Sequence, residues 1–370
     1  MLDQLVVGAA PGDAITITAL KLQEALSELG PCEVYARFHE GEMADRVRPL
    51  SELPTRPNAG RPLVFHASIG CWPVYDAVST HEQQLVLVYH NFSPPEFFES
   101  YDQSVADDLV RGWWELDNLR DRVVLAIADS EFNASEMRDH GYDRVEVIPP
   151  LPDVGRLVEN LPDPAMLRTI HAWGPGPVLL TVAQQLPHKR IERVLAAVAV
   201  LQQQFRADAH LALVGVERFP AYSAALASFA DSVGARNVHF LGRVDDAELS
   251  ALYLRSDAMV TMSDHEGFCV PVIEAMAAGL PVVASDRAAL PETVGDAGLV
   301  VDEPDDPVLV AAVLDRLLAD EGLCRTLSGR GVSRARRYDA TASLVRYLRV
   351  FSEHLPELVG AAPTGAGAGR

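Results

Sequence analysis

The sequence predicts an α/β protein with two parallel sheets, each covered by helices. Short apolar runs typical of buried strands alternate with stretches of helical periodicity through most of the 370 residues. A cluster of seven prolines between Pro149 and Pro177 interrupts this alternation, which then starts again. The chain also exceeds the usual size of a single core, so two domains are expected.

The first half of the chain predicts one Rossmann-like domain over residues 1–165. Apolar runs typical of buried strands occur at residues 5–8, 63–65, 85–89, 123–128 and 145–148. After the first run, Leu22, Leu26 and Leu29 recur at helical spacing, and Gly30 is suited to end that helix.

The second half predicts another such domain over residues 166–337. Its helix is expected at 191–205 and its strands at 178–183, 211–214, 238–241, 258–262, 282–285 and 299–301. A helix is also expected at 338–359, with a return to the N-terminal domain as one possibility, and the Gly- and Ala-rich tail 360–370 is predicted to be disordered. Ligands of such sheets bind beyond the carboxyl ends of the strands, so we expect two domains facing across a cleft.

The composition narrows the possible partners. A net charge of −21 argues against nucleic acid and against tight docking to anionic lipid, although one local basic face could still dock there. The N-terminus lacks a basic region and no apolar run is long enough to span a bilayer, so no stable membrane insertion is expected. Scattered cysteines are typical of reduced thiols in a cytoplasmic protein: Cys32, Cys71, Cys269 and Cys324.

The segment 263–285 carries the most chemical information. Glu266 follows a predicted strand in a loop where Gly267 gives backbone freedom, and a helix is expected to begin near Pro271 with Glu274 in its first turn. The free N–H groups at the start of this helix would suit a diphosphate. The two carboxylates could accept hydrogen bonds from sugar hydroxyls.

Glu266 and Glu274, with Gly-Phe-x-x-Pro beginning at Gly267, resemble the signature of family 4 retaining glycosyltransferases (group 1) of GT-B fold. The resemblance implies that Glu266 contacts the donor sugar and Glu274 the nucleotide ribose. It also implies donor contacts for the intervening backbone, at Gly267, Phe268, Cys269 and Val270. The family usually has Gly at the position of Cys269.

Two further segments of the second half resemble the family. Residues 182–189 resemble its Gly-Arg-Leu-x-Pro-x-Lys loop, which implies that Lys189 stabilises the departing diphosphate. Gln184 stands where the family has Arg, so Arg190 or another base would have to compensate. Residues 240–249 resemble the base-binding loop, in which the backbone of Arg243 and Val244 would meet the nucleobase.

The first half resembles a subgroup of these enzymes at residues 12–15, 65–70, 89–98 and 128–133. The resemblance implies that His90, at a strand end, faces the cleft near the donor sugar. Gly12 would let the first loop approach the donor phosphates. Asp129 is a weaker candidate for a residue that faces the cleft.

The resemblance therefore implies a metal-independent retaining glycosyltransferase without a cofactor, with Glu266, Lys189 and His90 as catalytic residues. It would use a nucleotide-diphosphate sugar and a saccharide or small-molecule acceptor, by same-face transfer that the leaving group assists. A silent nucleotide-sugar-binding subunit, or an epimerase or hydrolase on the same fold, remains an alternative. The donor sugar, nucleobase, acceptor, pathway and oligomeric state stay open.

Other readings of single features are less favoured. Asp264, His265 and Glu266 superficially suggest metal ligands, but adjacent side chains rarely all point inward and no further ligand set accompanies them. Trp113 and Trp114 suggest membrane contact, but a packed helix explains them better. The chain has no dinucleotide-binding, Walker, zinc-protease or hydrolase-elbow motif.

Overall fold

The computed structural model describes residues 2–54, 61–152, 155 and 160–355. The predicted tail at 360–370 and the end of the predicted helix 338–359 therefore lie outside the described residues. The chain divides into two compact units. The first comprises residues 1–92, 108–152 and 340–370, and the second comprises residues 93–107 and 153–339.

The first unit has a seven-stranded parallel sheet of order β3-β2-β1-β4-β5-β6-β7. Its strands are β1 (Asp3–Ala9), β2 (Val34–His39), β3 (Arg48–Pro49), β4 (Leu63–Ala67), β5 (Leu85–Tyr89), β6 (Val123–Ala128) and β7 (Val145–Val147). The five predicted strands are confirmed, whereas β2 and β3 were not predicted. The second half of β2 is exposed and β3 has two residues, so neither forms a sustained apolar run.

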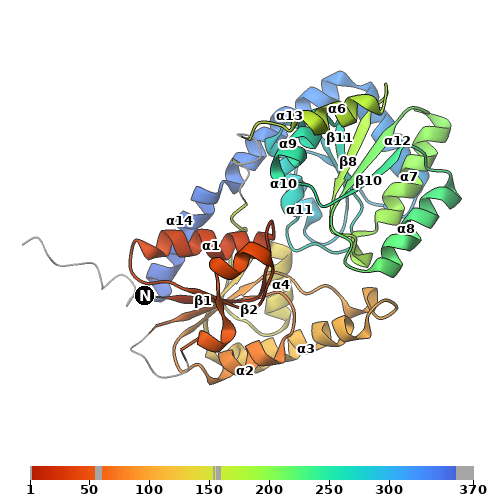
Figure 1. Cartoon of the computed structure of the whole chain (residues 1–370). Helices are drawn as coiled ribbons and strands as arrows, with labels where there is room; N and C mark the ends of the chain where they lie inside the picture. The colour runs from red at the N-terminus through yellow and green to blue at the C-terminus, as the bar shows by residue number, and fades with distance from the viewer. Residues whose placement is uncertain (1, 55–60, 153–154, 156–159, 356–370) are drawn as a thin grey trace, which may run out of the picture. The chain divides into compact units, whose positions relative to one another are not determined.

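The helices of the first unit come from both ends of the chain (Figure 1). They are α1 (Ala14–Ser27), α2 (Trp72–Thr80), most of α3 (Gln103–Leu119), α4 (Glu131–Asp139) and α14 (Ala340–His354). Tyr347 and Phe351 of α14 share one core cluster with Val64 of β4 and Val88 of β5. The helix near the C-terminus thus completes the core of the N-terminal unit.

The second unit has a six-stranded parallel sheet of order β10-β9-β8-β11-β12-β13. Its strands are β8 (Val178–Val182), β9 (His210–Val214), β10 (Val238–Gly242), β11 (Ala258–Thr261), β12 (Val282–Ser285) and β13 (Leu299–Val301). All six were predicted. Parallel pairing brings the carboxyl ends of β8 and β11 to the same edge of the sheet.

Helices cover both faces of this second sheet (Figure 1). One core contains residues of α7 (Ile191–Gln204), α8 (Pro220–Val233) and α12 (Pro307–Ala319). The other contains residues of α6 (Pro164–Ala172), α9 (Asp246–Arg255), α10 (Val270–Ala277), α11 (Leu290–Val294) and α13 (Glu321–Ala335). Because helices cover both faces of the sheet, its strands are buried on both sides, which explains their continuous apolar sequences.

The boundary between the units differs from the predicted one in the segment 93–107. We expected this segment in the N-terminal domain, but it belongs to the second unit. The ring of Phe98 lies 5.6 Å from that of His188 and 5.8 Å from that of Phe219, centroid to centroid. Aromatic burial against residues distant in sequence therefore decides its membership. The second unit also runs from 153 to 339 rather than from 166 to 337.

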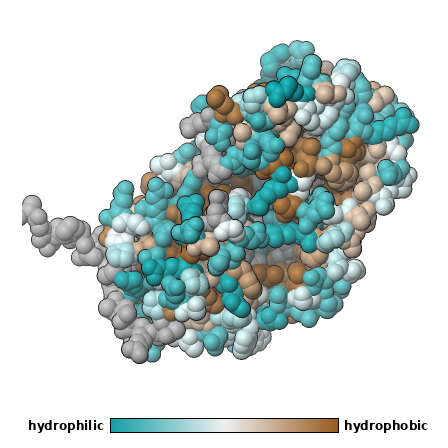
Figure 2. Space-filling model, in the orientation of Figure 1, coloured by the Kyte–Doolittle hydropathy of each residue, from teal (hydrophilic) through white to brown (hydrophobic). Residues whose placement is uncertain are grey.

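The surface fits the charged composition. On the face drawn in Figure 2, hydrophilic residues predominate and hydrophobic ones form small scattered groups. Among the helices that the structure describes, none combines the length and apolar character needed to cross a membrane.

Candidate functional site

The candidate site of the second unit lies where β8 and β11 end. The loop after β8 contains a short 3₁₀ helix, η5 (Pro187–Lys189), and the loop after β11 leads into α10. The backbone N–H of Asp264 donates to the carbonyl of His188 at 2.9 Å, which fastens the two loops together. Residues on neighbouring strands thus meet although they are far apart in sequence.

Lys189 and Glu266 form the central pair of this site. Lys189 Nζ lies 2.7 Å from Glu266 Oε2, and Ser263 Oγ donates to Glu266 Oε1 at 3.0 Å. The side chains of Lys189 and Glu266 are 18% and 10% exposed, so both are largely shielded but open to a ligand. The structure therefore brings together the two residues that the sequence predicted as catalytic and orients the carboxylate through both oxygens.

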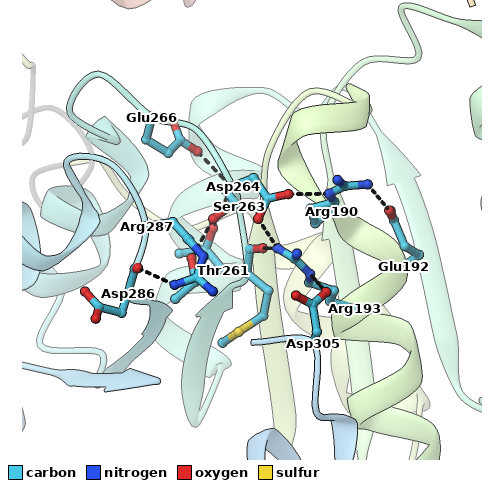
Figure 3. A network of polar contacts seen from close by, with 12 residues as sticks. Arg190, Glu192, Arg193, Thr261, Ser263, Asp264, Glu266, Asp286, Arg287 and Asp305 are labelled. Atoms are coloured by element: carbon cyan, nitrogen blue, oxygen red, sulfur yellow. Dashed lines mark hydrogen bonds and ion pairs between the residues drawn. The ribbon is translucent and has the colours of Figure 1, made fainter. Parts of the chain in front are cut away.

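Beside this pair, Asp264 is held by two guanidinium groups (Figure 3). Arg190 Nε donates to Asp264 Oδ2 at 2.6 Å, and Arg193 donates to Asp264 Oδ1. Burial alone would raise the pKa of Asp264, but the hydrogen bonds and charges of Arg193 and Arg190 lower it below its usual range. Asp264 is thus a charged anchor of the loop.

Arg190 is committed to this network. Besides Asp264 it contacts Glu192 at 3.4 Å, and its guanidinium carbon lies 5.1 Å from the ring centroid of Phe97. Its backbone is left-handed, with φ 48°. Sequence reasoning offered Arg190 as a substitute for the arginine absent at Gln184, but its guanidinium is engaged by two carboxylates.

A different arginine lies beside Gln184. Arg218 Nε donates to Gln184 Oε1 at 3.3 Å from the loop that follows β9. The N–H of Gln185 donates to the carbonyl of Val216 at 2.9 Å, so the loops after β8 and β9 run side by side. Sequence reasoning missed Arg218. Its place just after a strand that pairs with β8 was the available signal.

The start of α10 lies close to the predicted position, with one difference. The helix begins at Val270 after Cys269, so Glu274 lies in its second turn rather than its first. Cys269 has φ 71°, a left-handed conformation that explains why glycine suits this position. Its thiol is buried, which raises the pKa of Cys269 well above the usual range. Tyr253 donates its hydroxyl to Glu274 at 2.9 Å and thereby orients that carboxylate.

The loop around Gly267 is tied to α11. The hydroxyl of Thr293 donates to the carbonyl of Phe268 at 2.5 Å. Farther along the sheet edge, the predicted base-binding residues Arg243 and Val244 follow β10. Arg243 is exposed, while Val244 packs against the core.

In the first unit, His90 lies in a buried polar row rather than on an open surface. His90 Nδ1 is 2.9 Å from Asp129 Oδ2, and His90 Nε2 is 2.9 Å from His66 Nδ1. His66 Nε2 is in turn 3.0 Å from Gln4 Oε1. The side chain of His90 is 2% exposed, so its ring nitrogens bond to buried side chains rather than to solvent.

The hydrogen bonds of this row define where its protons lie. Burial lowers the pKa of His66 well below the usual range, so the ring is neutral and its Nε2–H donates to Gln4. His66 Nδ1 must then accept from the Nε2–H of His90.

Gly12, predicted to approach the donor phosphates, lies just before the start of α1. Gly12 has φ 75° in the loop after β1, and a side chain there would meet nothing within 4 Å. Asp13 next to it caps α1 by accepting from the N–H of Thr16 at 2.8 Å.

Within the described ranges, no group of three or more His, Cys, Asp or Glu residues is placed to hold a metal ion.

The fold is that of known glycosyltransferases. Over 97% of this chain and all of the other, it is similar to sucrose-phosphate synthase from Thermosynechococcus elongatus, with a TM-score of 0.74 and 19% identity. A second similar structure is WaaG, a glycosyltransferase involved in lipopolysaccharide biosynthesis, with a TM-score of 0.72, 16% identity, and 95% and 99% of the two chains covered. The predicted GT-B fold class is confirmed.

Residues 167–334 match the family of glycosyl transferases group 1. The segment contains Lys189, Glu266 and Glu274, so the resemblance predicted from these residues is confirmed. The chain is 40% identical over 101 residues to O-antigen chain mannosyltransferase B of Escherichia coli, covering 27% of this chain and 26% of that protein. It is 28% identical over 230 residues to a GDP-mannose-dependent alpha-mannosyltransferase of Mycolicibacterium smegmatis, covering 60% and 56%. These matches span less than two thirds of the relatives' lengths.

Proposed function

We propose that this protein is a retaining, metal-independent glycosyltransferase that moves a sugar from a nucleotide-diphosphate donor to a saccharide or small-molecule acceptor. The observation that carries the proposal is the pair of Lys189 and Glu266, 2.7 Å apart beside the start of α10. A cation, a carboxylate and a helix N-terminus at one sheet edge suit a diphosphate attached to a sugar.

Each group has a separate task in the proposed reaction. Lys189 and the free N–H groups of α10 stabilise the negative charge that develops on the departing diphosphate. Glu266, fixed by Ser263, accepts hydrogen bonds from the donor sugar. Glu274, oriented by Tyr253, accepts from the ribose hydroxyls. The acceptor hydroxyl then attacks the face from which the diphosphate leaves.

His90 has an indirect role in this proposal. Its ring nitrogens are bonded to His66 and Asp129, so the side chain shapes the end of β5. We therefore assign it to positioning the backbone of that turn, where Asn91 takes a left-handed φ of 79°. This replaces the direct sugar contact that the resemblance implied.

Gln184, which stands where the family has Arg, supported the alternative of a catalytically silent sugar-nucleotide-binding subunit. Arg218 brings a guanidinium to Gln184, so a cation does stand at that position of the sheet edge. This contact favours an active enzyme over a silent subunit.

The names of the relatives indicate which donor to test first. Several are mannosyltransferases, and two are described as GDP-mannose-dependent. GDP-mannose is therefore the first candidate, followed by UDP-, ADP- and dTDP-sugars. A thermal-shift screen with these donors should show a rise in melting temperature for at least one, because a ligand of the native state stabilises it.

The best binder is then assayed for hydrolysis, for epimerisation and for transfer to added saccharides without metal. Transfer with retention at the anomeric carbon supports the proposal. Epimerisation supports the alternative of an epimerase on the same fold, and hydrolysis that no acceptor suppresses supports a hydrolase. Binding without turnover supports the silent subunit, and the absence of any shift contradicts the donor site.

A further inference from the structure

Helix α13 and the turn after it carry four arginines, the arginine row, which border one hollow. Arg325, Arg330 and Arg334 lie on the helix, and Arg337 lies on the 3₁₀ turn that continues it, η6 (Arg336–Tyr338). Together with Asp296, Thr326, Gly329 and Ser333 they line an open hollow of about 440 Å³. This hollow is separate from the edge formed by the ends of β8 and β11.

The charges in this hollow are unbalanced. Arg325 is paired with Glu321 at 3.3 Å, and Asp296 is the carboxylate in the lining. Arg330 donates to the backbone carbonyl of Asp296 at 3.1 Å, which neutralises no charge. Among the described residues, Arg337 has no ion pair. Like charges one helical turn apart repel, and here they gather in a chain with a net charge of −21.

Arg334 is held in a fixed position at the inner side of the row. Its Nε donates to the carbonyl of Thr293 at 2.7 Å, and its Nη2 donates to the carbonyl of Glu292. Its guanidinium carbon also lies 5.6 Å from the ring centroid of Tyr338. Bonds to neutral carbonyls leave the positive charge uncompensated, so Arg334 adds to the field in the hollow.

The same arginine connects to the loop of the candidate donor site. The carbonyl of Thr293 accepts a hydrogen bond from Arg334, and the hydroxyl of Thr293 donates to the carbonyl of Phe268 at 2.5 Å. The ring of Phe268 also meets that of Tyr338 edge-on, with centroids 5.1 Å apart. Phe268 lies two residues after Glu266. Two short contact paths therefore join the hollow to the loop that carries Glu266.

We propose that the arginine row of α13 binds a phosphate-bearing ligand and that this binding fixes the donor loop through Arg334, Thr293 and Phe268. Guanidinium groups match phosphate oxygens in bidentate geometry, and the hydroxyl of Ser333 is placed to donate to a remaining oxygen, whereas that of Thr326 donates to the carbonyl of Gly322 at 2.8 Å. The bound anion removes the repulsion that Arg330 and Arg337 exert on Arg334. Arg334 then stays on its carbonyls and the loop is preorganised. The binding step goes beyond the proposed function, whereas the coupling step rests on it.

The test uses the full chain and inorganic phosphate, titrated calorimetrically at constant ionic strength. The double variant Arg330→Gln/Arg337→Gln keeps the side-chain stems and removes two charges. We expect its affinity for phosphate to be at least about tenfold weaker than that of the wild type, since each lost charge-assisted bond contributes strongly. Arg255→Ala, an exposed arginine of α9 in the same unit, is the matched control and should bind phosphate normally.

Phosphate could also bind at the donor site, so Lys189→Ala is titrated in parallel. Phosphate binding that survives Lys189→Ala but not the double variant supports the arginine row. The opposite pattern, equal binding by all variants, or no binding by the wild type overturns it. Vesicles with and without an anionic phospholipid separate the two sources of phosphate. If only anionic vesicles bind, and do so through Arg330 and Arg337, the ligand is a lipid headgroup.

The coupling step has its own measurement. The affinity for the nucleotide that the screen identifies is compared with and without saturating phosphate. We expect nucleotide binding to tighten about fivefold in the wild type and not in Thr293→Val, which retains phosphate binding but loses the bond to Phe268. Equal nucleotide affinity in both conditions would overturn the coupling. Failure to find any nucleotide would instead count against the proposed function.

Discussion

Lys189 Nζ and Glu266 Oε2 lie 2.7 Å apart although 77 residues separate them in the chain. The pair exists because β8 and β11 are parallel neighbours whose following loops meet at one edge of the sheet. Ser263 holds the second oxygen of Glu266 at 3.0 Å, so the carboxylate is oriented before any ligand arrives. Preorganised charge of this kind lowers the reorganisation needed when a substrate binds.

Under the proposed function, Lys189→Ala should reduce glycosyl transfer by about 10²–10³-fold, because the departing diphosphate would lose its principal cation. The change also leaves Glu266 without its partner, so Lys189→Ala/Glu266→Gln should recover stability but no activity. Steady-state transfer assays and thermal unfolding check the two expectations. Near-normal turnover by Lys189→Ala, with the fold intact, would remove Lys189 from the mechanism.

Cys269→Gly should be more stable than Cys269→Ala by about 1 kcal/mol. Both changes remove the buried thiol, but only glycine adopts the φ of 71° without steric cost. The comparison therefore isolates the backbone strain at the start of α10. Urea unfolding measures the difference, and an alanine variant at least as stable as the glycine variant would refute it.

Gly215→Ala should destabilise the second unit by about 3 kcal/mol. Gly215 has φ 148°, and an added Cβ would overlap the carbonyl oxygen of Ala183, where the loops after β8 and β9 meet. Gly329→Ala is the control, because that helical glycine has nothing within 4 Å of an added Cβ. It should stabilise the protein by about 1 kcal/mol. Similar unfolding midpoints for the two variants would show that the close approach at Gly215 is unimportant.

Glu115→Gln should become progressively more stable than the wild type as the pH rises from about 4.5 to about 7, and the difference should stay constant above that. Burial raises the pKa of Glu115 to about 7, although the N–H of Cys71, which donates at 3.1 Å, opposes the shift. Between its ordinary pKa of 4.5 and 7, the folded state holds a proton that the unfolded state has released. The stability that this proton provides is present at low pH and is lost as the pH rises.

The measurement compares melting temperatures of the wild type and Glu115→Gln from pH 5 to pH 8. The two should coincide near pH 5 and differ by about 2–4 °C at pH 8, the shift that about 1 kcal/mol produces in a domain of this size. A pH-independent difference would mean that the carboxyl of Glu115 is ionised throughout.

The sequence by itself determined the class of the fold and the centre of the candidate site. Covered parallel strands must be apolar along their whole length, so eleven of the thirteen strands among the described residues are recognisable as local apolar runs. The segments that contain Glu266, Glu274 and Lys189 follow two of these runs, and the roles predicted for the three residues came from the resemblance of those segments to a known family. Local sequence was sufficient here because each segment is a short stretch of consecutive residues.

Only the tertiary structure decided which distant segments pack together. It assigned residues 93–107 to the second unit and α14 to the first. It also enclosed His90 between His66 and Asp129, placed Arg218 rather than Arg190 beside Gln184, and linked Arg334 to Phe268 through Thr293. These relationships join residues on different elements. They depend on strand order and side-chain packing, which local periodicity does not encode.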